Sequence, residues 1–150
     1  MKKILILAML IGVVMACNKE KRFSKRLIKG EHWKVESVMV DGSNLALSGE
    51  WTVKGDDIYK EVPRIEWVMN SSDPTMIEWQ FQEKGDVYQF NYVQLCEECD
   101  GTLLEELDYA VYNLTGKYKV EKHKRKALTF TSEETIGYKG KKVEIKISRN

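Results

Sequence analysis

Apolar and polar residues alternate along most of the chain from Trp33 onward, and this alternation limits the possible fold more than any other feature. In segment 142–148, KVEIKIS, valine and isoleucine alternate with charged residues. Successive side chains of a β-strand point to opposite faces, so this pattern predicts a strand with one buried face. Further strand candidates cover 32–40, 50–53, 64–69 and 108–114. Elsewhere the alternation turns the following residues to one face of their strands: Ile77, Trp79 and Phe81; Tyr88, Phe90 and Tyr92; Tyr118 and Val120; Leu128 and Phe130.

Turn-forming residues separate these segments. Aspartate, asparagine, glycine and proline gather at 41–42, 54–56, 70–74, 84–86 and 139–140, where they favour chain reversal. The chain therefore predicts one all-β domain of eight or nine short antiparallel strands. Because open sheet edges invite aggregation, we expect an up-and-down β-barrel of about eight strands, or else a strongly curved sandwich. One or two short helices are expected beside the strands, one of them beginning at a capping box over 102–105.

The chain begins MKKILILAMLIGVVMAC, which joins a basic start, an apolar run and a cysteine. The apolar run is shorter than the ~20 residues that span a bilayer, and it is typical of a secretory signal peptide. The segment 14–17, VMAC, resembles the lipobox of bacterial lipoproteins. This resemblance implies cleavage before Cys17 and acylation of that residue; an uncleaved apolar anchor is the alternative. We therefore predict a signal peptide over 1–16, a lipidated Cys17, export, and anchoring in the outer membrane.

Residues 17–29 would join this anchor to the domain, and they are strongly basic. One interpretation is a solvated spacer, and another is electrostatic adherence to anionic lipid headgroups. In a third, Phe23, Leu27 and Ile28 form a short amphipathic helix that docks on the domain. The mature chain as a whole is nearly neutral, with 22 basic and 23 acidic residues once Lys2 and Lys3 are removed. This balance gives no case for nucleic acid as a partner.

Cys96 and Cys99 lie in the most acidic part of the chain. In an oxidising compartment their close spacing favours a local disulfide, which would stabilise the fold by roughly 2 kcal/mol. Unpaired or labile thiols are one alternative. A metal or redox site is another, although a structural zinc needs four ligands and a redox cysteine favours the start of a helix.

Two parts of the domain resemble bacterial lipocalin-like lipoproteins. The first is LIKGEHWKVES at 27–37, followed by VDG at 40–42, in which a glycine and a tryptophan open the first barrel strand. The second is LTGKYKV at 114–120, followed by ALTFT at 127–131. The resemblance covers most of 27–148 and implies a calycin-type barrel over 30–150 that binds a small apolar ligand. A META-like or other lipoprotein β-fold is the alternative.

The chain carries no motif for catalysis, and we expect a non-catalytic protein without a metal or cofactor. Patterns for a nucleophile elbow, a zinc protease, a phosphate loop and an EF-hand are missing from the sequence. The acidic segment 97–108 predicts a solvated loop, with cation binding or a partner contact as the alternative. The basic segment 117–126 predicts a charged strand pair and hairpin tip, with contact to an acidic polymer or lipid surface as the alternative. His32 and His123 are expected at the surface.

The inward aromatic residues are the strongest indication of function. The interior of an eight-stranded barrel is just wide enough to be filled by side chains or to admit one small ligand. Two functions therefore stay open: a carrier of a small apolar ligand, and a structural or protein-interaction module of the envelope with a filled core. A redox or metal protein centred on the two cysteines is a third. The residues predicted to line a ligand are Trp33, Trp79, Tyr88, Phe90, Tyr92, Tyr118 and Phe130.

Overall fold

The computed structural model describes residues 19–55, 63–70, 73–93 and 106–150. Within them a helix runs through residues 19–30. A 3-10 turn, η1 (Glu83–Gly85), and a second helix, α2 (Glu106–Leu114), also occur. The nine described strands are β1 (His32–Val40), β2 (Ser43–Asn44), β3 (Glu50–Lys54), β4 (Arg64–Val68), β5 (Thr75–Gln82), β6 (Val87–Val93), β7 (Gly116–Lys124), β8 (Ala127–Ser132) and β9 (Val143–Ser148).

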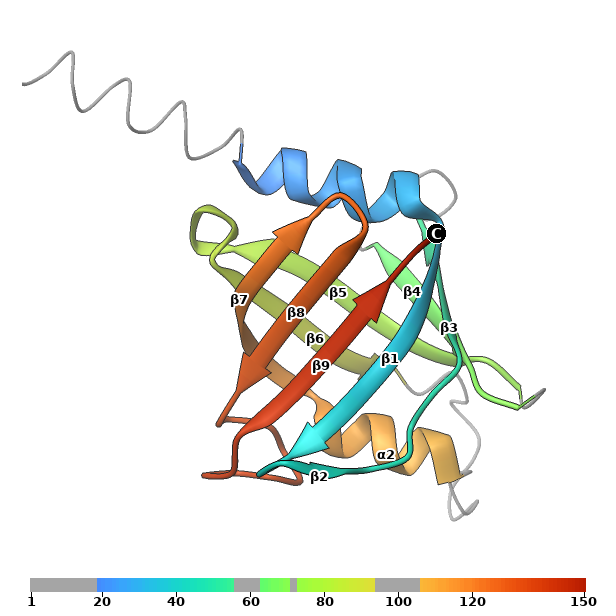
Figure 1. Ribbon diagram of the computed structural model, residues 1–150, viewed down its shortest axis with the longest axis vertical. Helices are drawn as coiled ribbons and strands as arrows, with labels where there is room; N and C mark the ends of the chain where they lie inside the picture. Colours follow the sequence, from blue (N-terminus) through green and yellow to red (C-terminus); the bar gives the residue numbers. More distant parts are fainter. Residues whose placement is uncertain (1–18, 56–62, 71–72, 94–105) are drawn as a thin grey trace, which may run out of the picture.

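The strands form one antiparallel sheet that closes on itself (Figure 1). From β3 to β9 each strand pairs with the next one along the chain, and β1 pairs with both β3 and β9. Val35 lies opposite Ile147, and Val38 opposite Ile145, at the seam that closes the barrel. The two-residue β2 pairs with β1 and stands outside the ring of eight. This confirms the predicted up-and-down β-barrel and excludes the curved sandwich.

The apolar faces of the strands point into the barrel, as the alternation predicts. Every inward position of β9 is at most 1% exposed. The largest buried side chains are those of Trp33, Trp51, Trp67 and Trp79, each also at most 1% exposed. Trp33 lies opposite Trp51, and Trp51 opposite Trp67, so three indoles stand side by side across β1, β3 and β4. Aromatic rings therefore make up much of the barrel interior.

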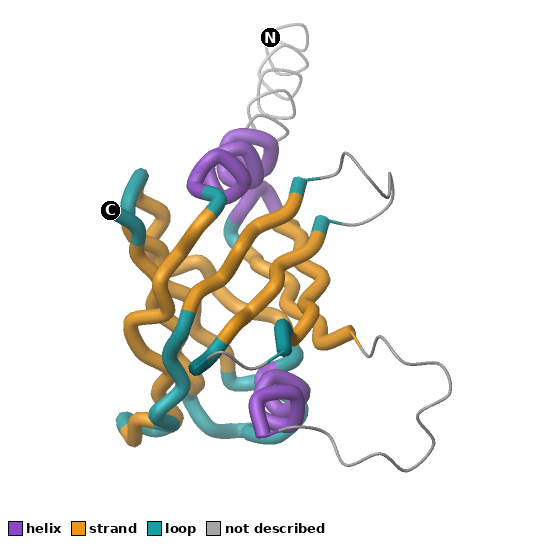
Figure 2. The backbone as a smooth tube through the Cα atoms, turned by 90° about the vertical axis from the view of Figure 1, so that its right-hand side faces the viewer, coloured by secondary structure: helices purple, strands orange, loops and turns teal. Residues whose placement is uncertain are grey.

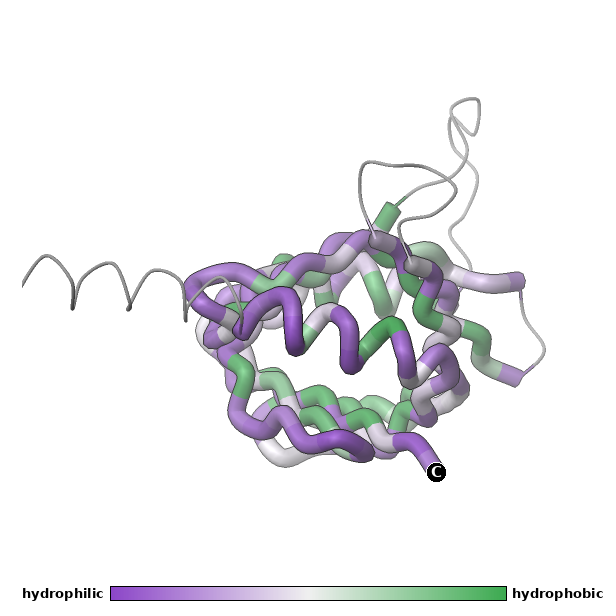
Figure 3. Tube along the Cα trace, turned by 90° about the horizontal axis from the view of Figure 1, so that it is seen from above, coloured by the Kyte–Doolittle hydropathy of each residue, from purple (hydrophilic) through white to green (hydrophobic). Residues whose placement is uncertain are grey.

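A helix covers each end of the barrel (Figure 2). Residues 19–30 lie across one end of the barrel (Figure 3). Phe23 and Leu27 of this helix are buried among the barrel residues. At the other end α2 buries Leu107, Val111 and Leu114. Of the three interpretations of segment 17–29, the docked amphipathic helix is the one that its described part adopts. Neither helix, nor any other in the described residues, is both long and apolar enough to cross a membrane.

The strand predicted over 108–114 is wrong, because these residues belong to helix α2. The three buried residues of α2 are spaced four and three positions apart, which places them on one face of a helix. That helical spacing decides against a strand, in which they would not share a face. The capping box at 102–105 lies outside the described residues.

Candidate functional site

Six of the seven residues predicted to line a ligand are buried inside the barrel. Trp33, Trp79, Tyr88, Phe90, Tyr118 and Phe130 are each at most 1% exposed. Tyr92 differs, because it lies half-buried near the end of β6 and its ring contacts that of Tyr112 on α2 at 6.2 Å. Tyr92 therefore packs beside the interior cluster rather than within it.

The interior rings contact one another in two groups. Tyr88 stacks on Phe130 at 4.4 Å between ring centroids, and it also lies 6.2 Å from Trp79. Phe90 lies 6.0 Å from Tyr118 and 5.8 Å from Trp51. These are ordinary separations for packed aromatic pairs. Six of the seven predicted residues thus belong to one buried core, although five different strands supply the set.

Sequence reasoning missed Trp51 and Trp67, which are as deeply buried as the predicted residues. Their strands were predicted, and in each the tryptophan alternates with a second inward residue, Val53 in β3 and Ile65 in β4. That alternation was therefore a signal for both rings. It is weaker than in other strands, because β3 and β4 have only two inward positions each.

Three interior rings use their polar atom to hold the ends of the barrel. The indole N–H of Trp33 donates to the carbonyl of Leu27 at 2.9 Å, which ties the helix over 19–30 to β1. The indole N–H of Trp67 donates to the carbonyl of Ser48 at 2.8 Å. The Tyr118 hydroxyl donates to the carbonyl of Leu114, at the end of α2, at 2.6 Å. These three hydrogen bonds satisfy their donors and fasten the covering segments.

Three other interior rings have a polar atom that is buried but not hydrogen-bonded. Among the described residues, no partner meets the indole N–H of Trp51, the indole N–H of Trp79 or the hydroxyl of Tyr88. An unpaired buried donor costs about 1–3 kcal/mol, and most buried polar groups in proteins are paired. Three such donors in one small interior therefore call for a physical explanation.

The buried tyrosines stay protonated at physiological pH. Burial, and then the nearby Tyr118, raises the pKa of Tyr88 well above its usual value. Burial, and then Tyr138, raises the pKa of Tyr118 as well. The Tyr88 hydroxyl is therefore available as a neutral hydrogen-bond donor, and no ionised group arises from these rings.

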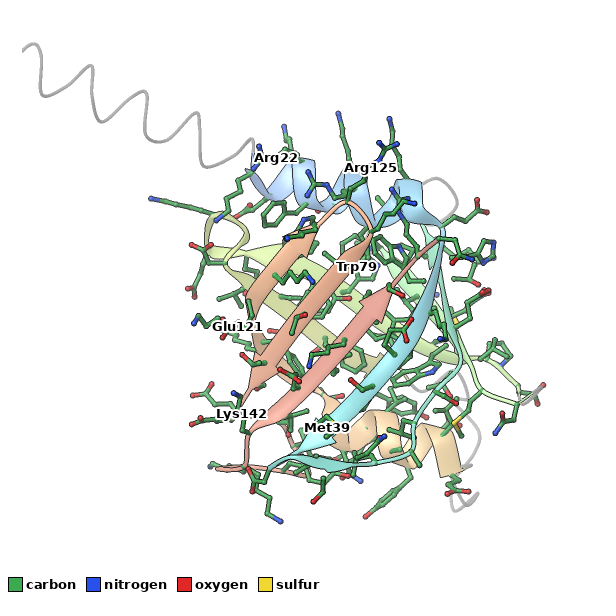
Figure 4. All side chains as sticks on the ribbon, viewed as in Figure 1. Arg22, Met39, Trp79, Glu121, Arg125 and Lys142 are labelled. Atoms are coloured by element: carbon green, nitrogen blue, oxygen red, sulfur yellow. The ribbon has the colours of Figure 1, made fainter. Side chains whose placement is uncertain are left out.

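A basic groove of about 510 Å³ lies outside the barrel at the end covered by the helix over 19–30. All of the described side chains that line it are cations: Arg22, Lys25, Arg26, Lys29, Arg125 and Arg149. Four come from the helix, Arg125 lies between β7 and β8, and Arg149 follows β9 (Figure 4). A second groove, of about 460 Å³, is lined by a mixture of acids and bases from β7, β8 and the segment before β9.

Carbonyl oxygens and an aromatic ring hold two cations of the basic groove, Arg26 and Arg149, in place. Arg26 donates to the backbone carbonyl of His123 at 3.0 Å, and Arg149 to that of Arg125 at 2.9 Å. The guanidinium of Arg149 also lies 5.2 Å from the centroid of the Trp33 ring. None of these contacts neutralises charge.

Contrary to the prediction, His123 does not lie at the surface but is half-buried. Its ring stacks on Phe23 at 3.5 Å between centroids, and its Nδ1 lies 3.0 Å from an Arg26 nitrogen. Burial, followed by the charge of Arg26, lowers the pKa of His123 to about 4, so the ring is neutral at pH 7. His32 is exposed, as predicted, and its Nδ1 lies 2.9 Å from a carboxylate oxygen of Glu50.

The remaining predicted sites are only partly covered by the structure. Cys17, Cys96 and Cys99 lie outside the described residues, so lipidation and the disulfide stay predictions. The described residues contain no group of three or more histidine, cysteine, aspartate and glutamate side chains that could hold a metal ion. The basic segment 117–126 forms β7 and the tip of its hairpin with β8, as predicted.

The chain was compared with protein-family models, curated proteins and solved structures, and none of them matches it.

Proposed function

We propose that the protein is an exported, lipid-anchored envelope protein of lipocalin-like type that binds a small, mostly apolar ligand inside its barrel. The observation that carries this proposal is the set of three buried and unpaired ring donors, on Trp51, Trp79 and Tyr88. Binding, rather than catalysis, fits an interior built from aromatic and aliphatic side chains.

The three donors also indicate the chemistry of the ligand. An indole N–H can only donate, so the ligand must offer hydrogen-bond acceptors. A charged ligand would be costly in this interior, because the described side chains buried there are apolar or neutral. A carbonyl or ether group on an apolar skeleton meets both conditions. The preferred ligand class is therefore neutral, apolar and acceptor-bearing.

The anchor is the second part of the proposal. The lipobox-like end of the apolar run supports lipidation of Cys17. Cys17→Ser should then abolish lipid labelling and release the protein from the membrane fraction. Intact mass and fractionation measure both effects, and unchanged fractionation of the variant would contradict the anchor.

The test of ligand binding removes the three donors and keeps an aromatic ring at each position. The wild-type protein is extracted in mild detergent and examined by native mass spectrometry, where we expect a bound small molecule. The triple variant Trp51→Phe/Trp79→Phe/Tyr88→Phe should lose it. Tyr109→Phe is the matched control, because it removes a hydroxyl from a side chain on α2 that is 60% exposed. A wild-type protein without a bound molecule, or an equally loaded triple variant, would overturn the proposal.

The contacts among the interior rings favour a second candidate, an interaction module of the envelope with a filled core. Centroid separations of 4.4 to 6.2 Å between the interior rings are those of a packed core. In that case no molecule should be bound or lost, and Tyr88→Phe alone, which removes an unpaired donor and keeps its ring, should be neutral or stabilising.

A further inference from the structure

We propose that the basic groove binds the phosphate groups of anionic membrane lipids. It would thereby orient the barrel so that the end covered by the helix over 19–30 faces the membrane. The proposal extends the proposed function, because it rests partly on the anchor at Cys17. It concerns a different surface from the ligand site, since the groove lies outside the barrel.

The helix over 19–30 separates its two faces by charge. Arg22, Lys25, Arg26 and Lys29 follow one another at intervals of three, one and three residues, so they share one face. Phe23 and Leu27 occupy the other face and are buried on the barrel. The helix therefore exposes Arg22, Lys25 and Lys29 as a basic stripe, while Arg26 turns back to the carbonyl of His123. Figure 4 shows side chains extending outward from this helix.

Barrel closure enlarges this stripe into a groove. Arg125 and Arg149 lie about a hundred residues or more along the chain from Arg22, yet they line the same groove. Arg125 stands at the tip of the β7–β8 hairpin, and its backbone carbonyl accepts the hydrogen bond of Arg149. Two strand ends and one helix thus combine six cations at one end of the molecule.

Within the described part of the chain, these cations lack the acidic partners that other basic residues have. Elsewhere the structure pairs Lys54 with Glu66, Lys119 with Glu121 and Lys146 with Glu144, at 2.7 to 3.4 Å. Among the described residues, none of the six groove cations forms an ion pair with a carboxylate within 4.0 Å. The groove keeps its positive charge, and a ligand of opposite sign is what it can bind.

The position of the groove decides between a membrane and a soluble anion. Cys17 precedes the first described residue of the helix by only two positions, so a lipid on Cys17 would bring this helix to the lipid headgroups. An open surface of lysines and arginines matches the phosphates of anionic lipids, and a tether keeps it within a Debye length of them. Arginine guanidinium groups can also donate two parallel hydrogen bonds to phosphate. A membrane therefore suits both the charge and the place of the groove.

The experiment measures protection of groove lysines on two kinds of membrane. The full-length protein is reconstituted into vesicles of phosphatidylcholine alone, or of phosphatidylcholine with phosphatidylglycerol, and exposed to a water-soluble amine reagent. Mass spectrometry then gives the labelling rates of Lys25 and Lys29. Lys142, which lies toward the other end of the barrel, is the internal control (Figure 4). We expect labelling of Lys25 and Lys29 to fall about fivefold or more on anionic vesicles, to recover in 0.5 M salt, and to leave Lys142 unchanged.

A charge-reversal variant ties the effect to the groove. Arg22→Glu/Arg125→Glu changes two exposed groove residues and retains both reporter lysines, so it should abolish their protection. Lys139→Glu/Lys141→Glu makes the same change in net charge at exposed positions outside the groove, and it should leave protection intact.

Two results would overturn the proposal. One is equal labelling of Lys25 and Lys29 on neutral and anionic vesicles. The other is equal protection on neutral vesicles when inorganic pyrophosphate is added, which would make the groove a site for a soluble anion. The mass of Cys17 in the same sample tests the anchor separately: protected lysines beside an unmodified Cys17 would refute the anchor and keep the groove proposal.

Discussion

Each end of the barrel is covered by a helix that a ring inside the barrel holds by a hydrogen bond, but the two ends present different surfaces. At one end the Trp33 indole holds the helix over 19–30 through the carbonyl of Leu27, and at the other the Tyr118 hydroxyl holds α2 through the carbonyl of Leu114. In both cases an interior ring donates to a carbonyl in the last turn of the helix, where such groups lack a partner within the helix.

Outside these hydrogen bonds the ends have little in common. The helix over 19–30 carries the basic groove, whereas the first turn of α2 carries Glu106 and Asp108. Tyr109 and Tyr112 of α2 are also exposed, at 60% and 41%. The comparison indicates that the two helices stabilise the barrel in the same way, through buried apolar faces and one hydrogen bond each. Their outer faces differ in charge and can therefore bind different partners.

The largest expected loss of stability comes from truncating a buried tryptophan, either at the helix-covered end of the barrel or in its wall. Trp33→Ala removes a buried indole and its bond to Leu27, and Trp79→Ala removes an indole without a bonding partner in the described residues. Both should destabilise the fold by about 3–5 kcal/mol in urea unfolding. Only Trp33→Ala should also speed hydrogen exchange in the helix over 19–30. A nearly neutral Trp79→Ala would mean that this ring is not a core residue.

Truncating one buried leucine in each helix tests whether the two helices contribute equally to the stability of the fold. Leu27 and Leu114 are both fully buried, so Leu27→Ala and Leu114→Ala should each cost about 2–5 kcal/mol. Urea midpoints compare the two variants directly. If Leu27→Ala were silent, the helix over 19–30 would be a detachable stalk rather than part of the core.

Removing one tyrosine hydroxyl should change the stability of the fold in opposite directions at two interior positions. Tyr118→Phe leaves the Leu114 carbonyl without its bond and should cost about 1 kcal/mol, while Tyr88→Phe removes an unpaired donor and should be neutral or stabilising in protein without ligand. Thermal unfolding of the two variants side by side measures this difference. A costly Tyr88→Phe in ligand-free protein would show that its hydroxyl has a partner.

The smallest expected effect is a pH dependence of stability that arises from His123, beside the helix over 19–30. Burial, followed by the charge of Arg26, lowers the pKa of His123 to about 4 from a usual value of 6.5. The unfolded chain therefore takes up a proton at a higher pH than the folded protein does. This contribution to stability is fully present above about pH 7 and is lost as the pH falls toward 4.

His123→Gln should flatten this part of the profile in urea midpoints measured between pH 7 and 4.5. An unchanged slope would mean that folding does not shift the pKa of His123.

Much of the barrel followed from the sequence, because the pleat of a strand sends alternate side chains to opposite faces. This is why the inward residues of β5, β6 and β9 were predicted without knowledge of their neighbours. Segment 108–114 failed because its predicted bounds left out Leu107, whose spacing from Val111 and Leu114 is helical. Their burial at the end of the barrel shows that these three residues form the inward face of a helix. His123 failed because the partner that buries it, Phe23, lies a hundred residues earlier.

By itself, then, the sequence determined an antiparallel barrel with aromatic rings inside, because local periodicity settles which face each residue occupies. Tertiary structure alone decided which of those rings would find a hydrogen-bond acceptor, since Leu27, Ser48 and Leu114 reach their donors only when the ends are covered. It also decided that Arg125 and Arg149 would join the basic stripe of the helix. Both outcomes depend on contacts between residues distant in the chain, and ring closure is what creates those contacts.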